Sequence, residues 1–257
     1  MCRPGGAGSA GSRRPTPARG PAGSSLWLLA AACLMLVGTL GMVWMPPARQ
    51  IRSAGSTAPL RFDLGPLAAP GFWPVVAAIL GAAVGLSMAF TSIAARAQRH
   101  GLPAAAGYIE AAIALGSVTG GLLWGRRRHT RTHWTHLAGL IGVLAIGIAI
   151  CAAVTSLTAL GTLMAVIGLA IAPLFVVSYL AADELAPEHQ QTEASTWVNT
   201  ANNIGSAAGA SVAGLLIDRA SISVGFAVGG VILGLTSVLI SLTHRSNEAN
   251  SGTCEAV

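Results

Sequence analysis

A single carboxylate lies well inside one of the long apolar stretches of the sequence. Glu110 follows Pro103–Ala104 by about six residues, which places it roughly 9 Å along a helix. A carboxylate in such surroundings is a candidate for proton coupling or for cation binding. The alternative is a hydrated position near the helix end, close to Arg96 or Arg99.

Amides and hydroxyls crowd the segment 192–219 (TEASTWVNTANNIGSAAGASVAGLLIDR), whose second half is otherwise apolar. On a helix, polar side chains at spacing i, i+4, i+7 and i+11 share one stripe, and small residues form a second stripe. Because amides in hydrocarbon are costly, the polar stripe must meet another helix or a water-filled cavity. Two interpretations remain open: a pathway-lining helix, or interhelical hydrogen bonds worth roughly 0.6–2 kcal/mol each. The polar stripe is Ser195, Asn199, Asn202 and Ser206, and the small stripe is Ala201, Gly205, Gly209 and Ala213.

Three histidines, His129, His133 and His136, have a spacing that could hold zinc. No acid or cysteine lies beside them and the loop RRRHTR is strongly basic, so we interpret them as part of a basic loop. The four cysteines show no paired spacing and predict neither a disulfide framework nor a metal site. The sequence also lacks the GxSxG, P-loop and HExxH motifs. We therefore expect no metal, no cofactor and no enzymatic activity.

The composition sets the class of protein that must hold these groups. Hydrophobic residues make up 53% of the chain, charged residues only 9%, and the mean hydropathy is +0.65. Soluble domains carry about 25% charged residues, so a chain this poor in charge indicates an integral membrane protein. The net charge of +6 comes wholly from arginine. No basic stripe with interleaved aromatic residues is present, so we expect no nucleic-acid partner.

Seven apolar segments are each near the ~20 residues that a helix needs to cross a bilayer. Backbone groups in hydrocarbon must be satisfied within the segment, so all seven are predicted to be helices and the fold class is all-α. Residues 1–25, rich in Gly, Pro and Arg, are expected to be disordered, with 46–72 a linker and 244–257 a tail. The predicted spans are 26–45, 73–95, 104–124, 134–154, 157–181, 194–217 and 222–243, of which the last six form one bundle over 73–243.

Three further signals refine these spans. All six tryptophans fall near predicted span ends, where the indole ring prefers the headgroup layer. Pro173 is expected to kink the span 157–181. Glycines recur at four-residue spacing, which lets helices approach closely in lipid, and we attribute most pairs to packing within one bundle. The pairs are Gly81 and Gly85, Gly116 and Gly120, Gly121 and Gly125, Gly225 and Gly229, and Gly230 and Gly234.

Arginine is unevenly distributed between the two sides of the predicted membrane. Outside the long first tail, eight arginines fall on the side of the linker, the loop 126–131 and the last tail, against three on the other side. Positive charge is enriched in cytoplasmic loops. We therefore expect the linker, this loop and the C-terminus in the cytoplasm, and the N-terminus outside.

Two stretches carry a resemblance to the major facilitator superfamily. Residues 173–219 resemble the family's helix 10, a short acidic loop and helix 11. Residues 96–131 resemble an outer loop, helix 8 and a basic inner loop, in which Gly125 stands where Asp is common and Arg128 where Gly is common. A charge lock through that Asp cannot be carried over. The first match is carried by Asp183, Leu185, Ala186, Pro187, Thr192, Glu193, Ala194, Trp197, Asn203, Gly205 and Gly209.

On this mapping the seven spans resemble family helices 6 to 12, the C-terminal half of a bacterial efflux-type transporter. The resemblance implies that helices 7 and 10 face a central cavity, and that the polar and small stripes of 195–213 face a half outside this chain. It implies proton-coupled efflux of a small molecule across the cell's inner (plasma) membrane. The alternatives are a truncated or non-transporting remnant, or a half that needs a separate N-terminal half or a second copy.

The same resemblance suggests roles for particular residues. Glu110 is the candidate for proton coupling. The expected partners are the lipid bilayer and a small-molecule substrate. The pathway-lining candidates are Asn199, Asn202, Asn203, Ser87, Thr91, Ser178 and Tyr179, and the cytoplasmic gate candidates are Arg126, Arg127, Asp183 and Glu193.

Overall fold

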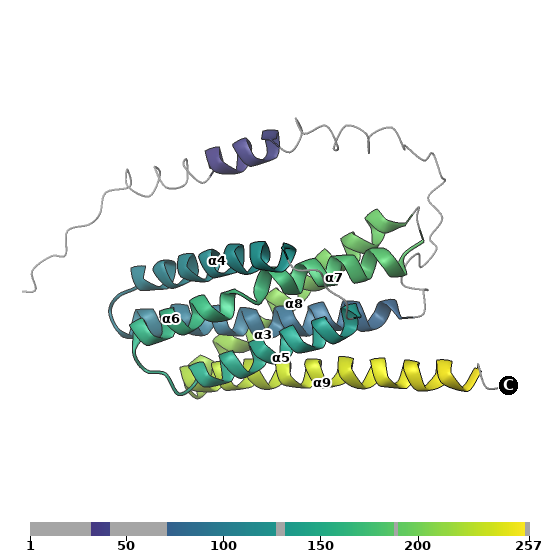
Figure 1. Ribbon diagram of the computed structural model, residues 1–257. Coiled ribbons are helices and arrows are strands. Elements are labelled where there is room, and N and C mark those ends of the chain that lie inside the picture. Colours follow the sequence, from purple (N-terminus) through teal and green to yellow (C-terminus); the bar gives the residue numbers. More distant parts are fainter. Residues whose placement is uncertain (1–31, 42–70, 127–131, 188–189, 255–257) are drawn as a thin grey trace, which may run out of the picture. The chain divides into compact units, whose positions relative to one another are not determined.

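The computed structural model describes residues 32–41, 71–126, 132–187 and 190–254. Every regular element in these ranges is an α-helix, which confirms the all-α class. Figure 1 shows helices α3 to α9. Their bounds are α3 Phe72–Arg99, α4 Ala104–Gly125, α5 His133–Cys151, α6 Leu157–Gly168, α7 Ile171–Leu185, α8 Gln191–Arg219 and α9 Ile222–Cys254.

The chain divides into two compact units, Met1–Arg61 and Phe62–Val257. The first unit contains an apolar helix, Ala32–Gly41, whose residues are exposed. This helix lies within the predicted span 26–45. The rest of that span, the tail 1–25 and the linker up to residue 70 lie outside the described residues.

Five stretches of the second unit are long and apolar enough to cross a membrane. They coincide with five of the predicted spans, and together they confirm an integral membrane fold. The predicted span 194–217 is also one continuous helix, α8, of 29 residues or about 44 Å. Its amides and hydroxyls make it more polar than the other spans. The five apolar stretches are Phe72–Arg99, Ala104–Gly125, His133–Cys151, Leu157–Leu185 and Ile222–His244.

The stretch 157–185 contains two helices rather than one kinked helix, and the break precedes Pro173. Helix α6 ends at Gly168 and α7 begins at Ile171. Pro173 has no N–H for the carbonyl of Leu169, four residues earlier. The end of α6 closes instead with two backbone hydrogen bonds of the shorter i→i−3 kind. The expected interruption is present, but it is a break at residues 169–170 rather than a kink, and it includes Leu169, whose carbonyl the proline leaves without a helical donor.

Helix α3 is the most buried helix of the second unit, and it packs along both α8 and α9. Helix α5 packs along α9, and α4 packs along α6 and α7. One apolar cluster joins α3, α4, α5, α6, α7 and α9, and a second joins α3, α7 and α8. In lipid these contacts stabilise the bundle by close packing, because the alternative surroundings are also apolar.

Most of the predicted glycine pairs lie at these helix contacts. A β-carbon at Gly116 or Gly120 of α4 would overlap the backbone oxygen of Ala165 or Leu169. Gly85 of α3 meets α9 in the same way, and only Gly125 among the paired glycines has open space around it. The expectation that these pairs serve packing within one bundle is confirmed for most of them.

Tryptophan marks helix ends, as predicted. Trp73 and Trp134 are the second residues of α3 and α5, Trp124 is the second-last residue of α4, and Trp197 lies in the second turn of α8. Trp27 and Trp44 lie outside the described residues. Helix α9 does not end at residue 243 but continues to Cys254.

Candidate transport face

Helix α8 has two neighbouring faces with different surroundings. Its small residues are buried: a β-carbon at Gly205 would lie 2.6 Å from the backbone oxygen of Leu80, and one at Gly209 would overlap that of Val84, both on α3. The small stripe is therefore a packing surface, as its spacing indicates. The resemblance placed it against a half outside the chain, and that expectation is corrected: its partner is α3. Helical spacing shows which residues share a face, but not which helix meets that face.

The polar stripe lies beside the small stripe on a more accessible flank of α8. Asn199 and Asn203 are exposed, and Asn202 is half-buried. None of these three amides has a hydrogen-bond partner within the described residues. The hydroxyls of Thr196 and Thr200, by comparison, donate to carbonyls of their own helix one turn earlier. The amides are therefore the groups on this face that still need partners.

Two hydroxyl candidates on α3 lie beside α8. Ser87 Oγ donates a 2.7 Å hydrogen bond to the carbonyl of Ser206 on α8, and Thr91 Oγ1 donates to the carbonyl of Ser87 at 2.9 Å. Both side chains are half-buried. The structure thus brings Ser87 to the polar stripe, where its hydroxyl joins the two helices.

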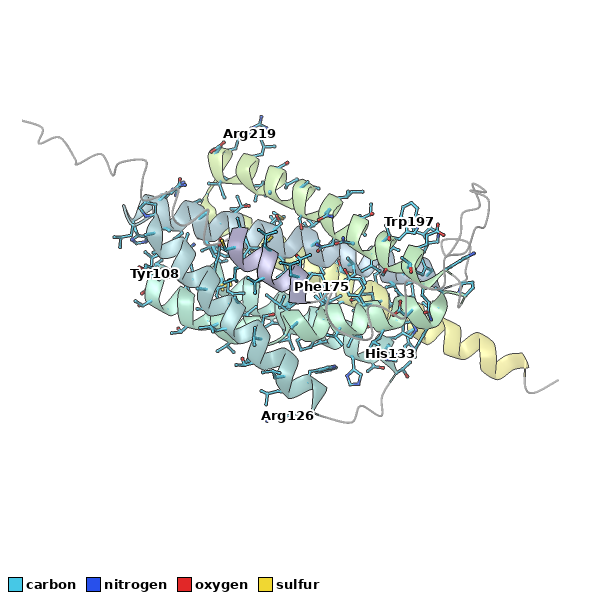
Figure 2. All side chains as sticks on the ribbon, turned by 90° about the horizontal axis from the view of Figure 1, so that it is seen from above. Tyr108, Arg126, His133, Phe175, Trp197 and Arg219 are labelled. Atoms are coloured by element: carbon cyan, nitrogen blue, oxygen red, sulfur yellow. The ribbon has the colours of Figure 1, made fainter. Side chains whose placement is uncertain are left out.

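The two candidates on α7 lie differently from each other. Ser178 is fully buried, and its hydroxyl donates to the carbonyl of Leu174 at 2.7 Å. Tyr179 is half-buried and packs, like Phe175, against the apolar cluster of α3, α7 and α8. Figure 2 shows Phe175 near the middle of the bundle. Of the two candidates, Tyr179 alone keeps accessible surface.

Glu110 is exposed on α4. The buried stripe of this helix faces α6 and α7, and Glu110 lies on a flank with Ser117 and Gly121, seven and eleven residues later. That flank borders α7, because a β-carbon at Gly121 would lie 3.2 Å from Ala172. Within the described residues Glu110 forms no ion pair.

A buried arginine is the feature that sequence reasoning missed. Arg96, at the end of α3, is 6% exposed, and its guanidinium donates to the carbonyl of Cys151 at 3.3 Å and to that of Val154. It also reaches Ser223 Oγ at 3.4 Å and lies 5.0 Å from the ring centre of Phe226. These contacts join α3, α5 and α9. The available signal was the C-terminal end of α5, where the helix dipole favours a nearby cation.

The remaining charged candidates lie at the other end of the bundle. Figure 2 shows His133 and Trp197 toward that end, away from Tyr108 and Arg219. His133 Nδ1 lies 3.0 Å from Glu184 Oε2, a pair that joins the start of α5 to the end of α7. Among the predicted gate residues, Arg126 and Glu193 are exposed, Asp183 is half-buried, and no ion pair joins these three in the described part of the chain. Arg127 and His129 lie outside the described residues.

Three cavities lie between helices of the bundle. They measure about 530 Å³ between α5 and α9, about 250 Å³ between α3 and α9, and about 460 Å³ between α4 and α6. None of these three is lined by a residue of α8. The polar stripe of α8 is therefore a face that needs a second surface before it can enclose a small molecule.

Comparison with known proteins identifies the family. The sequence model of the Major Facilitator Superfamily matches residues 22–210 and again residues 76–255, and the first match alone covers more than half of the chain. No curated protein and no solved structure gives a significant match. The all-helical bundle with five apolar spans agrees with the family match. The chain therefore belongs to the major facilitator superfamily of membrane transporters.

Proposed function

We propose that the chain is the C-terminal half of a secondary active transporter and that the polar face of α8 lines the pathway of a small molecule. Membership of the family supports a membrane transporter in general. The observation that carries the finer proposal is the contrast between the two faces of α8. Small residues pack on α3, while three amides have no partner within the described residues. In a bilayer those amides need water, substrate or another polypeptide, and a hydrated pathway supplies the first two.

Proton-coupled efflux is the mode that we propose for this transporter. The sequence has no P-loop, so we infer that an ion gradient supplies the energy and that the chain is not an enzyme. Glu110 is an acid within the apolar span Ala104–Gly125, and it has no fixed cationic partner in the described residues. A carboxylate without a fixed counter-charge can exchange a proton when its surroundings change. We assign Glu110 the coupling role.

The proposed orientation places the C-terminus and the basic loop 126–131 in the cytoplasm of a cell whose inner (plasma) membrane holds the protein. The excess of arginine on that side supports it. Arg126, Arg127, Asp183 and Glu193 then belong to the cytoplasmic end, where we propose that they form a gate. The His133–Glu184 pair lies at the same end of the bundle.

Efflux of ethidium from cells that lack their own drug exporters tests this proposal, with lactose uptake by counterflow as the test of a sugar substrate. We expect transport that a protonophore stops and that Glu110→Gln abolishes. Asp218→Asn is the matched control, because Asp218 is an exposed acid at the far end of α8. Transport against a gradient that survives in Glu110→Gln would exclude the coupling role.

A second candidate function is a half that works only with a separate N-terminal half or with a second copy of this chain. Residues 76–210 lie in both of the stretches that match the family model. The family's two similar halves produce such a pattern. The open polar face of α8 would then meet the second half.

Crosslinking separates the two candidates. In a chain whose four cysteines are replaced by serine, Asn202→Cys should form a disulfide between two copies if they pair through α8. A crosslinked band at twice 25.8 kDa would support pairing of copies. Efflux that appears only on co-expression with a separate N-terminal half would support the split transporter. The absence of both the crosslinked band and this efflux would favour a non-transporting remnant.

A further inference from the structure

The groove between α5 and α9 has one polar end and one apolar end. It has a volume of about 530 Å³. Trp134, Thr135 and His244 line one end, and Val143 and Ile146 line the other, roughly 18 Å away along α5. Val143 and Ile146 are both exposed, and both helices belong to apolar spans. The groove therefore opens onto an apolar surface that suits the lipid side of the bundle.

The floor of the groove consists of small residues whose neighbouring polar atoms already have partners. Ser237 Oγ donates to the carbonyl of Ala138 at 2.8 Å, and Ser241 Oγ donates to the carbonyl of Ser237 at 2.9 Å. A β-carbon added at Gly139 would meet no atom within 4 Å, so the space above this residue is open. An apolar chain can lie on such a floor without leaving a hydroxyl unpaired.

The polar end of the groove lies at the charged end of the bundle. Trp134 lies there, and indole rings favour the headgroup layer of a bilayer. The rings of Trp124 and His136 meet edge to face at 5.1 Å, which holds the end of α4 against the start of α5. Arg126, exposed just after α4, therefore lies at this end as well. A cation at this end of the bundle favours an anionic lipid headgroup over a neutral one.

We propose that this groove binds an anionic phospholipid, with one acyl chain along Gly139 and Gly142 and the headgroup at Trp134 and His244. The volume selects an acyl chain rather than another helix. A helix of ~10 Å diameter over the same length would fill more than twice the space. The site is separate from the α8 face, so it stands whether or not the transport proposal holds.

Fluorescence quenching tests the site directly, because a brominated acyl chain quenches tryptophan only on contact. The full chain would keep Trp134, with phenylalanine at the other five tryptophans. It would be reconstituted in phosphatidylcholine that contains a small fraction of phosphatidylglycerol brominated near the headgroup end of its acyl chain, the part that the proposal places beside Trp134. We expect quenching that corresponds to about fivefold enrichment of the anionic lipid over its mole fraction, the ratio expected from one nearby arginine.

Two glycine substitutions decide whether the groove is responsible. Gly139→Leu fills the open space and should return quenching to the mole fraction. Gly107→Leu on α4 is the matched control, since a β-carbon there also meets nothing within 4 Å, and it should keep the enrichment. Quenching that follows the mole fraction in the parent chain, equal quenching by brominated phosphatidylcholine, or enrichment that survives Gly139→Leu would each overturn the proposal. Circular dichroism of both variants confirms that they fold.

Discussion

Two helix pairs of the bundle pack glycines against backbone oxygens, but one pair contains a continuous helix and the other an interrupted one. In the pair α3–α8, Gly205 and Gly209 lie against backbone oxygens of α3. In the pair formed by α4 with α6, Gly116 and Gly120 lie against the backbone oxygens of Ala165 and Leu169. Helix α8 is continuous over 29 residues, whereas the apolar stretch that contains α6 and α7 is interrupted after Gly168.

The two pairs differ in the continuity of the helix. Helix α8 is unbroken, so its packed face sets the direction of its polar face, whereas the apolar stretch that contains α6 and α7 is interrupted. In α3–α8 the contact fixes the rotation of an intact helix and so keeps the amides of Asn199 and Asn202 on the open side. In the second pair, Pro173 has no N–H to donate to the carbonyl of Leu169, and this carbonyl lies against Gly120. The break between α6 and α7 therefore lies at a close contact with α4.

Valine at the buried glycines should destabilise both helix pairs more than any other change considered below. Overpacking costs about 1–3 kcal/mol or more, and backbone oxygens cannot move aside as a side chain can. We expect Gly205→Val and Gly120→Val each to lower the thermal stability of the detergent-solubilised protein strongly, as measured by size-exclusion chromatography after heating. Gly214→Val on α8 is the control, because a β-carbon there meets nothing within 4 Å. Equal loss in Gly214→Val would mean that valine itself, not the contact, is responsible.

Alanine at Arg96 should produce the next largest loss of stability, because Arg96 joins α3 to α5 and α9. The substitution removes the guanidinium donor from the carbonyls of Cys151 and Val154, of which Cys151 keeps the backbone N–H of Val154, at a cost of about 2 kcal/mol. Arg99→Ala, three residues later and exposed, is the control. Unfolding in increasing dodecyl sulfate, followed by circular dichroism, measures both. Matching curves for the two variants would refute the structural role of Arg96.

The positions of the helices could be predicted from the sequence, but which helices pack against each other could not. Apolar length predicted the spans, and four-residue spacing predicted the small stripe of α8, because both depend on local geometry alone. The partner of that stripe could not be predicted, since one face of small residues fits any helix that offers its backbone. Arg96 was expected as a loop charge because it lies at a span end. Its long side chain instead turns toward carbonyls at the end of α5, of which that of Cys151 lies 55 residues away along the chain.

Alanine at Pro173 should restore the backbone N–H that is missing next to the break between α6 and α7. If the proline causes the break, the new N–H can bond to the carbonyl of Leu169 and extend α7 toward α6. One added hydrogen bond is worth about 1 kcal/mol, so amide exchange around residues 169–174 should slow by roughly fivefold. Hydrogen exchange followed by mass spectrometry measures this, with Pro103→Ala before α4 as the control. Unchanged exchange would assign the break to the Gly120 contact instead.

Removal of the His133–Glu184 pair should have the smallest effect. Both side chains are partly exposed, so a double-mutant cycle with His133→Gln and Glu184→Gln should give a coupling below about 1 kcal/mol. The coupling should fall further at high salt, where exposed charges are screened. A larger, salt-independent value would mean that the end of α7 is held more firmly than its exposure indicates.

The accessibility of α8 to water tests most directly whether its polar face lines a hydrated pathway. In a cysteine-free chain, single cysteines would replace Asn199 and Asn202 on the open face, Ala201 on the α3 face, and Val231, which is 59% exposed on α9. A charged maleimide reacts with the thiolate, which forms in water but not in lipid or a packed interface. We expect Asn199→Cys and Asn202→Cys to be labelled and Ala201→Cys and Val231→Cys to stay unlabelled. If the two asparagine positions stay as unreactive as Val231→Cys, the polar face of α8 does not line a hydrated pathway.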